Sequence, residues 1–148
     1  MASAVRRAEA TWEGGLATGK GVVSAVSSGA FSDLPVTWAS RTERSGGSTS
    51  PEELVAAAHA SCYCMALSNG LGKEGTPPEK LEVSATVTFQ QIEGGWKVAS
   101  SALTVKGTVP GIDAARFQKV AEAAKDGCPI SGALTGNVDL SVEATLAG

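Results

Sequence analysis

Strict alternation of apolar and polar residues dominates the second half of the chain. Residues 80–92 place their apolar side chains on one face: Leu81, Val83, Ala85, Val87 and Phe89. This period of two predicts a half-buried β-strand. The glycine-containing turn at residues 93–95 favours a hairpin, so residues 96–108 are expected to return as the partner strand. Residues 137–146 alternate again and predict a last strand.

Shorter patterns near the start of the chain predict three more strands. Residues 4–12 alternate loosely and end at a Gly-Gly turn, and residues 20–27 are rich in valine. A third short strand is expected over residues 36–40, after Pro35. The polar, glycine-containing segment that follows, residues 41–49, predicts a loop.

The clearest helix begins at Ser50. Serine is a favoured N-cap, Pro51 suits the first helical position, and Glu53 completes an S-x-x-E capping box. Alanine and leucine dominate the helix, and Gly70 and Gly72 are expected to end it. Nearly every face is apolar or small, which predicts burial on most sides.

Two further helices are expected in the last third of the chain. Asp113 opens the first, whose apolar residues keep helical spacing up to Gly127. Cys128-Pro129 then begins a short helical segment through Leu134. Strands, helix, hairpin, helices and strand in this order predict an α+β fold with antiparallel sheets. A chain of 148 residues fits a single domain over residues 1–148.

Composition and charge exclude several classes of protein. The net charge is -3, the pI is about 5.2 and the basic residues are scattered, which argues against a nucleic-acid surface. No apolar run follows the first charges, so a signal peptide is not expected. The longest weakly polar stretch, residues 54–67, is too short and too interrupted to span a bilayer. A soluble, cytoplasmic protein is expected. In a reducing compartment its three cysteines are more often reactive or metal-binding than structural.

The spacing of the three cysteines limits their pairing. Cys62 and Cys64 are two residues apart on the predicted helix, so they point about 200° apart around its axis and cannot bond to each other. Cys128 lies on a different element, so a bridge between it and Cys62 is possible. A thiolate at Cys128 is favoured by the backbone N–H groups of a helix start.

Cys62 lies in mid-helix and gains nothing from its own helix dipole, so it needs an external cation. The candidates are Arg41 and Arg44 in the polar loop and His59 one turn earlier. Each also has a plain structural interpretation. A free cysteine among alanine and leucine is usually a small buried hydrophobe. His59 on an apolar helix face is more often a satisfied core histidine, and the arginines of a polar loop are usually solvated.

Two other chemistries stay open at this point. His59, Cys62 and Cys128 could hold a metal ion, but only these three ligands of suitable type are available. His59 could also act as the base for Cys62 in a hydrolase, although no motif for an oxyanion hole or an orienting Asp or Asn is visible.

Two motifs in these segments resemble those of a known family. Residues 50–62, S-P-E-E-L-V-A-A-A-H-A-S-C, resemble the central-helix motif of the OsmC/Ohr family, the osmotically inducible and organic hydroperoxide resistance proteins. Residues 127–131, G-C-P-I-S, resemble its second motif. The P-E-E triplet and the histidine resemble the OsmC branch, since Ohr proteins usually have P-E-Q and Tyr there. Ser50 departs from the asparagine usual before the proline but caps a helix equally well. Cys64 is a departure without an assigned role.

The resemblance implies an OsmC-like fold, with antiparallel sheets around a long buried central helix, and an interwound homodimer. It also implies a peroxiredoxin-like, non-haem hydroperoxide reductase with antioxidant function in the oxidative stress response. Such an enzyme reduces organic hydroperoxides, and hydrogen peroxide more weakly, without a metal or cofactor. The implied reductant is a dithiol on a lipoylated or thioredoxin-type protein. The alternative is a binding or stress protein of the same fold that has no peroxidase activity.

The resemblance also assigns roles to individual residues. Cys62 corresponds to the peroxidatic cysteine, and Cys128 to the resolving cysteine that forms a disulfide with it. Glu52 corresponds to the carboxylate that orients an active-site arginine. Arg41 is the match for this arginine, with Arg44 as the alternative.

Helix geometry adds a reason to expect two chains. Glu52 and Cys62 are ten residues apart, which is about 15 Å along a helix. An arginine held by Glu52 has difficulty reaching Cys62 of the same chain. A second chain laid antiparallel would bring its own arginine there, which agrees with the homodimer that the resemblance implies. We therefore expect two equivalent active sites at a dimer interface.

Overall fold

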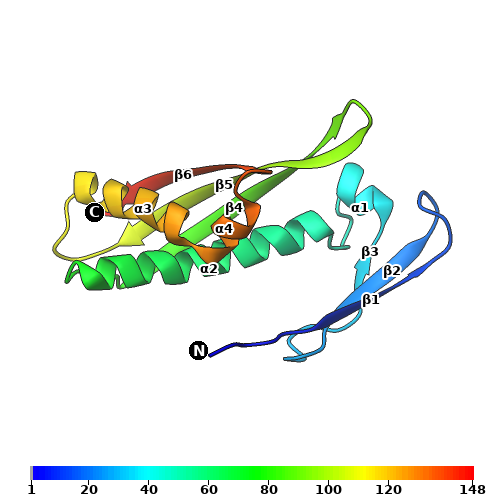
Figure 1. The fold of residues 1–148 in the computed structure, drawn as a ribbon, viewed down its shortest axis with the longest axis horizontal. Coiled ribbons are helices and arrows are strands. Elements are labelled where there is room, and N and C mark those ends of the chain that lie inside the picture. The colour runs from blue at the N-terminus through cyan, green and yellow to red at the C-terminus, as the bar shows by residue number, and fades with distance from the viewer. Residues whose placement is uncertain (1) are drawn as a thin grey trace. The chain divides into compact units, whose positions relative to one another are not determined.

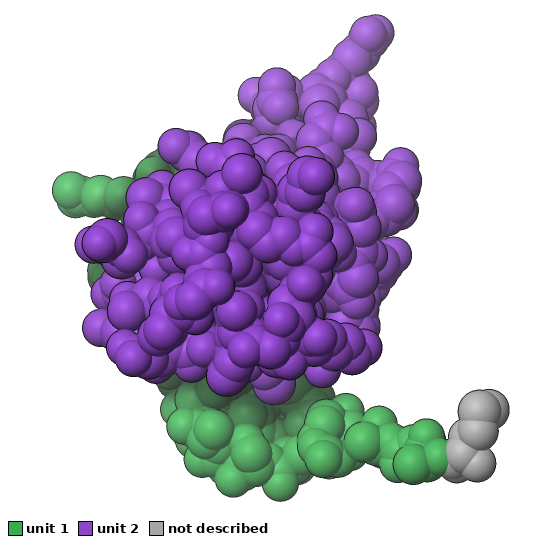
Figure 2. Space-filling view, turned by 90° about the vertical axis from the view of Figure 1, so that its left-hand side faces the viewer, with its two compact units in different colours: residues 1–53 green, residues 54–148 purple. Residues whose placement is uncertain are grey.

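The chain folds as two compact units. The computed structural model describes residues 2–148, and the units divide between residues 53 and 54 (Figure 2). We call residues 1–53 unit 1 and residues 54–148 unit 2. The expectation of one domain over residues 1–148 stays a prediction.

Unit 1 contains a small antiparallel sheet in the order β1-β2-β3. Its strands are β1 (Ala8–Glu13), β2 (Lys20–Ala25) and β3 (Leu34–Val36). Gly21 of β2 allows close packing here, because a Cβ would lie 2.5 Å from the Thr11 carbonyl oxygen and 2.7 Å from the Trp12 ring. The first two strands were predicted to within a few residues.

The strand predicted over residues 36–40 is wrong beyond Val36, because the chain turns into helix α1 (Trp38–Thr42). Thr37 caps this helix, since its hydroxyl accepts from the Ser40 N–H at 3.0 Å and the Ser40 hydroxyl accepts from the Thr37 N–H at 3.1 Å. Arg41 therefore lies on a helix instead of a loop.

Helix α2 (Pro51–Lys73) is the long helix that the sequence predicts. The Ser50 hydroxyl accepts from the Glu53 N–H at 3.1 Å, as expected of an N-cap. Gly70 and Gly72 do not end the helix, which continues to Lys73. Gly70 instead permits close packing, because a Cβ there would lie 3.2 Å from Val120.

One face of α2 is buried and another is exposed. His59, Tyr63, Leu67 and Leu71 are fully buried. The opposite side exposes small and apolar residues: Ala57, Ala58, Ser61 and Met65. The Met65 side chain is 69% exposed. The expected burial on most sides is therefore not reached within one chain.

The sheet of unit 2 has the order β4-β5-β6, with strands β4 (Lys80–Ile92), β5 (Gly95–Thr108) and β6 (Asp139–Leu146). The predicted β4–β5 hairpin is confirmed. β6, however, pairs with β5 in parallel, whereas antiparallel pairing was expected. Two helices connect these strands, α3 (Ala114–Gly127) and α4 (Pro129–Leu134). Such a crossover allows the chain to return in the same direction.

The core of unit 2 lies where α2 and α3 cover one face of this sheet (Figure 1). α2 contributes Tyr63, Leu67 and Leu71, and α3 contributes Phe117 and Ala121, among others. The same cluster includes Cys128, so the joint between α3 and α4 is anchored in the core. Within residues 2–148, no helix combines the length and the hydropathy that crossing a membrane needs.

Candidate active site

Cys62 and Cys128 face each other across the joint between three helices of unit 2. Cys62 is half-buried on α2, and Cys128 is 1% exposed at the residue that ends α3 and begins α4. Both thiols are free, Cys62 packs against the core cluster that contains Cys128, and each thiol shifts the pKa of the other. Two thiols on different elements of one cluster can form a disulfide when their Cα atoms come within about 7 Å of each other.

The environment distinguishes the two thiols. Burial raises the pKa of Cys62, and the adjacent Cys128 raises it further, against a hydrogen bond from the Ile130 backbone N–H. Burial also acts to raise the pKa of Cys128, but hydrogen bonds from the Ser131 backbone, the Cys62 thiol, the Ser131 hydroxyl and the Ile130 backbone outweigh it and lower the pKa. The surroundings therefore favour a negative charge on Cys128 over one on Cys62.

This difference agrees with the expectation from the sequence that backbone N–H groups favour a thiolate at Cys128. It also agrees with the expectation that Cys62 needs help from outside its own helix. The pKa of Cys62 is shifted by burial, by Cys128 and by the Ile130 backbone. None of these influences comes from a cation.

Arg41 and Glu52 form a tight ion pair within unit 1. The arginine Nε donates to Oε1 at 3.0 Å and a terminal nitrogen donates to Oε2 at 2.8 Å, so the pair is bidentate. Glu52 is 7% exposed, and the guanidinium carbon lies 5.6 Å from the centre of the Trp38 ring. The structure thus brings Glu52 together with Arg41, the first of the two arginines considered from the sequence.

A small apolar pocket lies beside this guanidinium. Its volume is about 330 Å³, and Trp12, Leu16, Trp38 and Arg41 are among its lining residues. All of these residues belong to unit 1. The pocket places a hydrogen-bonding cation against apolar walls, an arrangement that suits a ligand with one polar and one apolar end.

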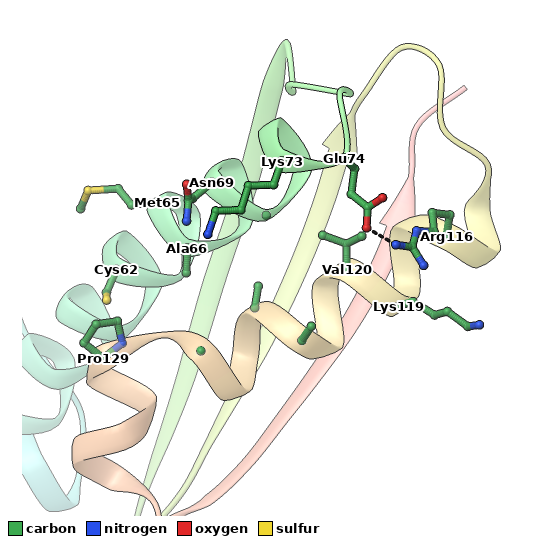
Figure 3. Close-up of a pocket in the computed structure, with 14 residues that line it drawn as sticks. Cys62, Met65, Ala66, Asn69, Lys73, Glu74, Arg116, Lys119, Val120 and Pro129 are labelled. Carbon is green, nitrogen blue, oxygen red and sulfur yellow. Dashed lines mark hydrogen bonds and ion pairs between the residues drawn. The ribbon is translucent and has the colours of Figure 1, made fainter.

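A larger groove in unit 2 contains Cys62. It runs between α2 and α3 and has a volume of about 880 Å³. Cys62 and Pro129 lie at one end, while Lys73, Lys119 and the ion pair between Arg116 and Glu74 lie toward the other (Figure 3). Small and apolar side chains line the space between: Met65, Ala66, Val120, Ala123 and Ala124.

His59 occupies a buried polar site close to Cys128. Its Nδ1 lies 2.6 Å from the Ser101 hydroxyl and its Nε2 lies 2.8 Å from the Ser131 hydroxyl. Burial lowers the pKa of His59, so the ring is neutral near pH 7. Both ring nitrogens are satisfied, which confirms the plain interpretation of a core histidine.

These contacts remove the basis of both alternative chemistries. A base for Cys62 would need a ring nitrogen free to accept its proton, and both nitrogens of His59 are bonded to serines. Across the described part of the chain, no group of three or more His, Cys, Asp or Glu side chains is arranged to hold a metal ion.

Cys64 differs from the other two cysteines. It is half-buried, and burial raises its pKa. This disfavours the reactive thiolate form. The environment supplies no role for Cys64 and makes it a suitable internal control.

Sequence reasoning missed the two serines that bind His59. A signal existed for each of them. Ser101 lies on the inward face of strand β5, together with the buried residues Leu103 and Val105. Ser131 is the last residue of the G-C-P-I-S motif. A polar residue on an otherwise apolar face indicates a buried partner.

Comparisons with known proteins agree with the motifs. The profile of the OsmC-like protein family matches residues 44–143. The chain is 38% identical over 138 residues to "Peroxiredoxin OsmC" of Escherichia coli (strain K12), covering 93% of this chain and 95% of that protein. It is 31% identical over 98 residues to the "Organic hydroperoxide resistance protein" of Xanthomonas axonopodis pv. citri (strain 306), covering 66% of this chain and 67% of that protein. The crystal structure of the organic hydroperoxide resistance protein OhrB of Bacillus subtilis superposes with a TM-score of 0.74 at 28% identity, covering 94% and 98% of the two chains.

Proposed function

Because this chain belongs to the OsmC-like protein family, we propose that it is a thiol-dependent peroxidase that reduces organic hydroperoxides to alcohols. The names of its relatives support a peroxidase-type function and imply a hydroperoxide substrate and a reductant. The observation that carries the proposal in this chain is the pair of free thiols, Cys62 and Cys128, that lie together at the core cluster of unit 2 and shift the pKa of each other.

In the first step of the proposed cycle, Cys62 acts as a thiolate. Its sulfur attacks the outer oxygen of ROOH, the O–O bond breaks, and the alkoxide takes up a proton and leaves as ROH. Cys62 is oxidised to a sulfenic acid. The half-buried position of Cys62 at one end of the groove gives it access to a substrate in a partly dry site.

Cys128 then resolves the sulfenic acid. Its thiolate attacks the Cys62 sulfur, an S–S bond forms, the S–O bond breaks, and hydroxide leaves and takes up a proton as water. An external dithiol reduces the disulfide by exchange and is itself oxidised to a disulfide. A lipoylated or thioredoxin-type protein is the proposed reductant, in the reducing compartment expected from the cysteines.

Arg41 and Glu52 complete the proposed site. The bidentate pair holds the guanidinium in a fixed orientation, which suits it to stabilise the Cys62 thiolate and to bind the peroxide oxygens. Cys62 needs such a cation, because burial raises its pKa.

A homodimer is part of the proposal. Glu52 and Cys62 are ten residues apart on the continuous helix α2, about 15 Å along its axis. A second copy laid antiparallel would supply its arginine to this Cys62. The exposed small and apolar face of α2 supports this arrangement, because such a face is stabilised when another chain covers it.

The preference for organic peroxides rests on apolar surface. The groove next to Cys62 is lined by alanine, valine and methionine, and the pocket next to Arg41 by tryptophan and leucine. Both would desolvate an alkyl group, which hydrogen peroxide lacks. We therefore expect kcat/KM to be higher for cumene hydroperoxide than for hydrogen peroxide.

The test is a peroxidase assay with cumene hydroperoxide and a dithiol. Cys62→Ser should abolish peroxide consumption, even in a single turnover. Cys128→Ser should consume one equivalent and then lose efficient recycling by the dithiol. Cys64→Ser is the matched control and should turn over at the wild-type rate. Equal activity of the wild type and all three variants would contradict the proposal, and inactivity of the wild type with every reductant would favour a binding or stress protein.

A further inference from the structure

A chain of buried polar groups leads from the sheet of unit 2 to Cys128. Ser101 on β5 contacts His59 at 2.6 Å, and His59 contacts Ser131 on α4 at 2.8 Å. Ser131 lies three residues after Cys128 on the same helical segment, and its side chain acts to lower the pKa of the Cys128 thiol. All four residues are at most 1% exposed, so water does not compete for these bonds.

The number of available protons decides which group donates in each hydrogen bond of this series. A serine hydroxyl has one proton, so Ser131 can donate to a Cys128 thiolate only if it accepts from His59. The Nε2 of the neutral ring must then carry the proton, and Nδ1 must accept from the Ser101 hydroxyl. In this arrangement every donor points toward Cys128. Hydrogen bonds aligned in this way polarise and strengthen one another.

We propose that His59 is a positioning residue that holds the Ser131 hydroxyl as a donor to the Cys128 thiolate, with Ser101 fixing the tautomer of the ring. The inference rests on the proposed function, in which Cys128 resolves the Cys62 sulfenic acid. It gives a role to the histidine of the central helix and to the serine that ends the G-C-P-I-S motif.

The role follows from the chemistry of resolution. The thiolate of Cys128 is the form that attacks the Cys62 sulfur, so a larger thiolate fraction speeds formation of the S–S bond and departure of hydroxide. A better stabilised thiolate is also a better leaving group when the external dithiol attacks Cys62 of the disulfide. Both steps are therefore expected to slow when a substitution removes the hydrogen bond between His59 and Ser131.

Other titratable groups around Cys128 lie on the helices packed against it. On α2 these are Cys62 and Tyr63, and the Tyr63 hydroxyl donates to the Ala121 carbonyl at 2.8 Å. On α3, the charge of Glu122 acts on Tyr63. Burial raises the pKa of Tyr63, so this group stays neutral while Cys128 titrates.

The experiment measures ionisation of Cys128 directly. In the full chain with Cys62→Ser and Cys64→Ser, Cys128 is the last remaining thiol, and its ultraviolet thiolate absorbance is followed against pH. The single tyrosine does not interfere, because its pKa is raised. Adding His59→Leu or Ser131→Ala should raise the apparent pKa of Cys128 by about one unit, a tenfold loss of thiolate at low fractional ionisation. His59→Gln retains an N–H near the Nε2 position and should restore most of the shift.

Ser61→Ala is the control, because Ser61 is exposed on the same helix and its hydroxyl bonds to the Ala57 and Ala58 carbonyls. It should leave the titration unchanged. An unchanged pKa in folded Ser131→Ala and His59→Leu would overturn the inference. If His59→Leu does not fold by circular dichroism, Ser131→Ala decides in the same way. The titration uses no peroxide, so it stands or falls separately from the peroxidase activity.

Discussion

At the residue scale, the central feature is the asymmetry between two neighbouring thiols. Burial acts on both, but the hydrogen bonds from Ser131 and Ile130 favour the negative charge on Cys128. The proposed mechanism needs the charge on Cys62 at the moment of attack. A cation such as Arg41 is therefore required to shift the balance, which is why the arginine is as important to the proposal as the sulfurs.

We predict that Arg41→Met lowers kcat/KM for cumene hydroperoxide by about 10² to 10³, the usual effect of removing one group that stabilises charge in the reaction. Arg41→Lys should recover only part of this loss, because lysine cannot make the bidentate pair with Glu52. Arg44→Met is the matched control and should retain the wild-type rate. Loss of activity in Arg44→Met with retention in Arg41→Met would reverse the assignment.

A second residue-scale prediction concerns pH and stability. Burial holds the pKa of His59 below the ordinary histidine value of 6.5, so the unfolded chain binds more protons than the folded chain below that pH. The free energy of unfolding should therefore decrease as the pH falls below 6.5, by at most about 1.4 kcal/mol per unit from this group. Urea denaturation should show a weaker decrease for His59→Gln than for the wild type.

His59 is the chain's only histidine, so the difference between the two proteins isolates its contribution. Above about pH 7.5 the two stability curves should run parallel, because a group with a pKa near 6.5 is neutral in both states there. If the stability curves of the wild type and His59→Gln also ran parallel below pH 6.5, this would contradict the burial of a neutral His59 ring.

Much of the candidate site could be predicted from the residues themselves. The two cysteine motifs and Glu52 are local in sequence, and a helix start at Cys128-Pro129 is visible there. The pairing of His59 with Ser101 and Ser131 could not be predicted, because it joins three elements far apart in the chain. The choice between Arg41 and Arg44 depended on a short helix that the pattern did not reveal.

At the element scale, the long periodic segments were predicted and the short or topological features were not. The β4–β5 hairpin, α2 and α3 follow from alternation, capping and helical spacing. Helix α1 is only five residues long, and its capping box uses two hydroxyl side chains that also suit a strand end or a loop. The parallel pairing of β5 with β6 depends on where two helices pack, and no local pattern in β6 encodes it.

The packing of α3 on β5 can be tested at Gly107. A Cβ there would lie 2.5 Å from the ring of Phe117, which is fully buried and cannot move freely. Gly107→Ala should destabilise the protein by about 1–3 kcal/mol through overpacking. The control is Gly132→Ala on α4, which has nothing within 4 Å of an added Cβ and should be neutral or mildly stabilising. Urea midpoints of the two variants measure the difference, and equal midpoints would contradict this packing.

At the scale of the whole molecule, the two halves of the proposed site belong to different units. The thiols lie in unit 2, and the pair of Arg41 with Glu52 lies in unit 1. A single chain leaves a small and apolar face of α2 exposed, including Ala58 and Met65. The proposed homodimer accounts for both features, since it covers that face and provides a second arginine.

We predict that Ala58→Glu converts the proposed dimer to a monomer and removes most peroxidase activity, because a buried and unpaired carboxylate disfavours the interface. Ser141→Glu, on the exposed polar face of β6, is the control and should leave mass and activity unchanged. Light scattering coupled to size-exclusion chromatography measures the mass. A wild-type protein that is monomeric and fully active at high dilution would refute the dimeric site.

The most direct test of the central claim is to locate the oxidised sulfurs after one equivalent of cumene hydroperoxide. Peptide mapping by mass spectrometry should find a disulfide between Cys62 and Cys128 in the wild type. In Cys128→Ser, it should find a sulfenic acid at Cys62 that dimedone traps, with Cys64 still reduced. Oxidation that falls first on Cys64 or Cys128, or no oxidation of any cysteine, would contradict the account.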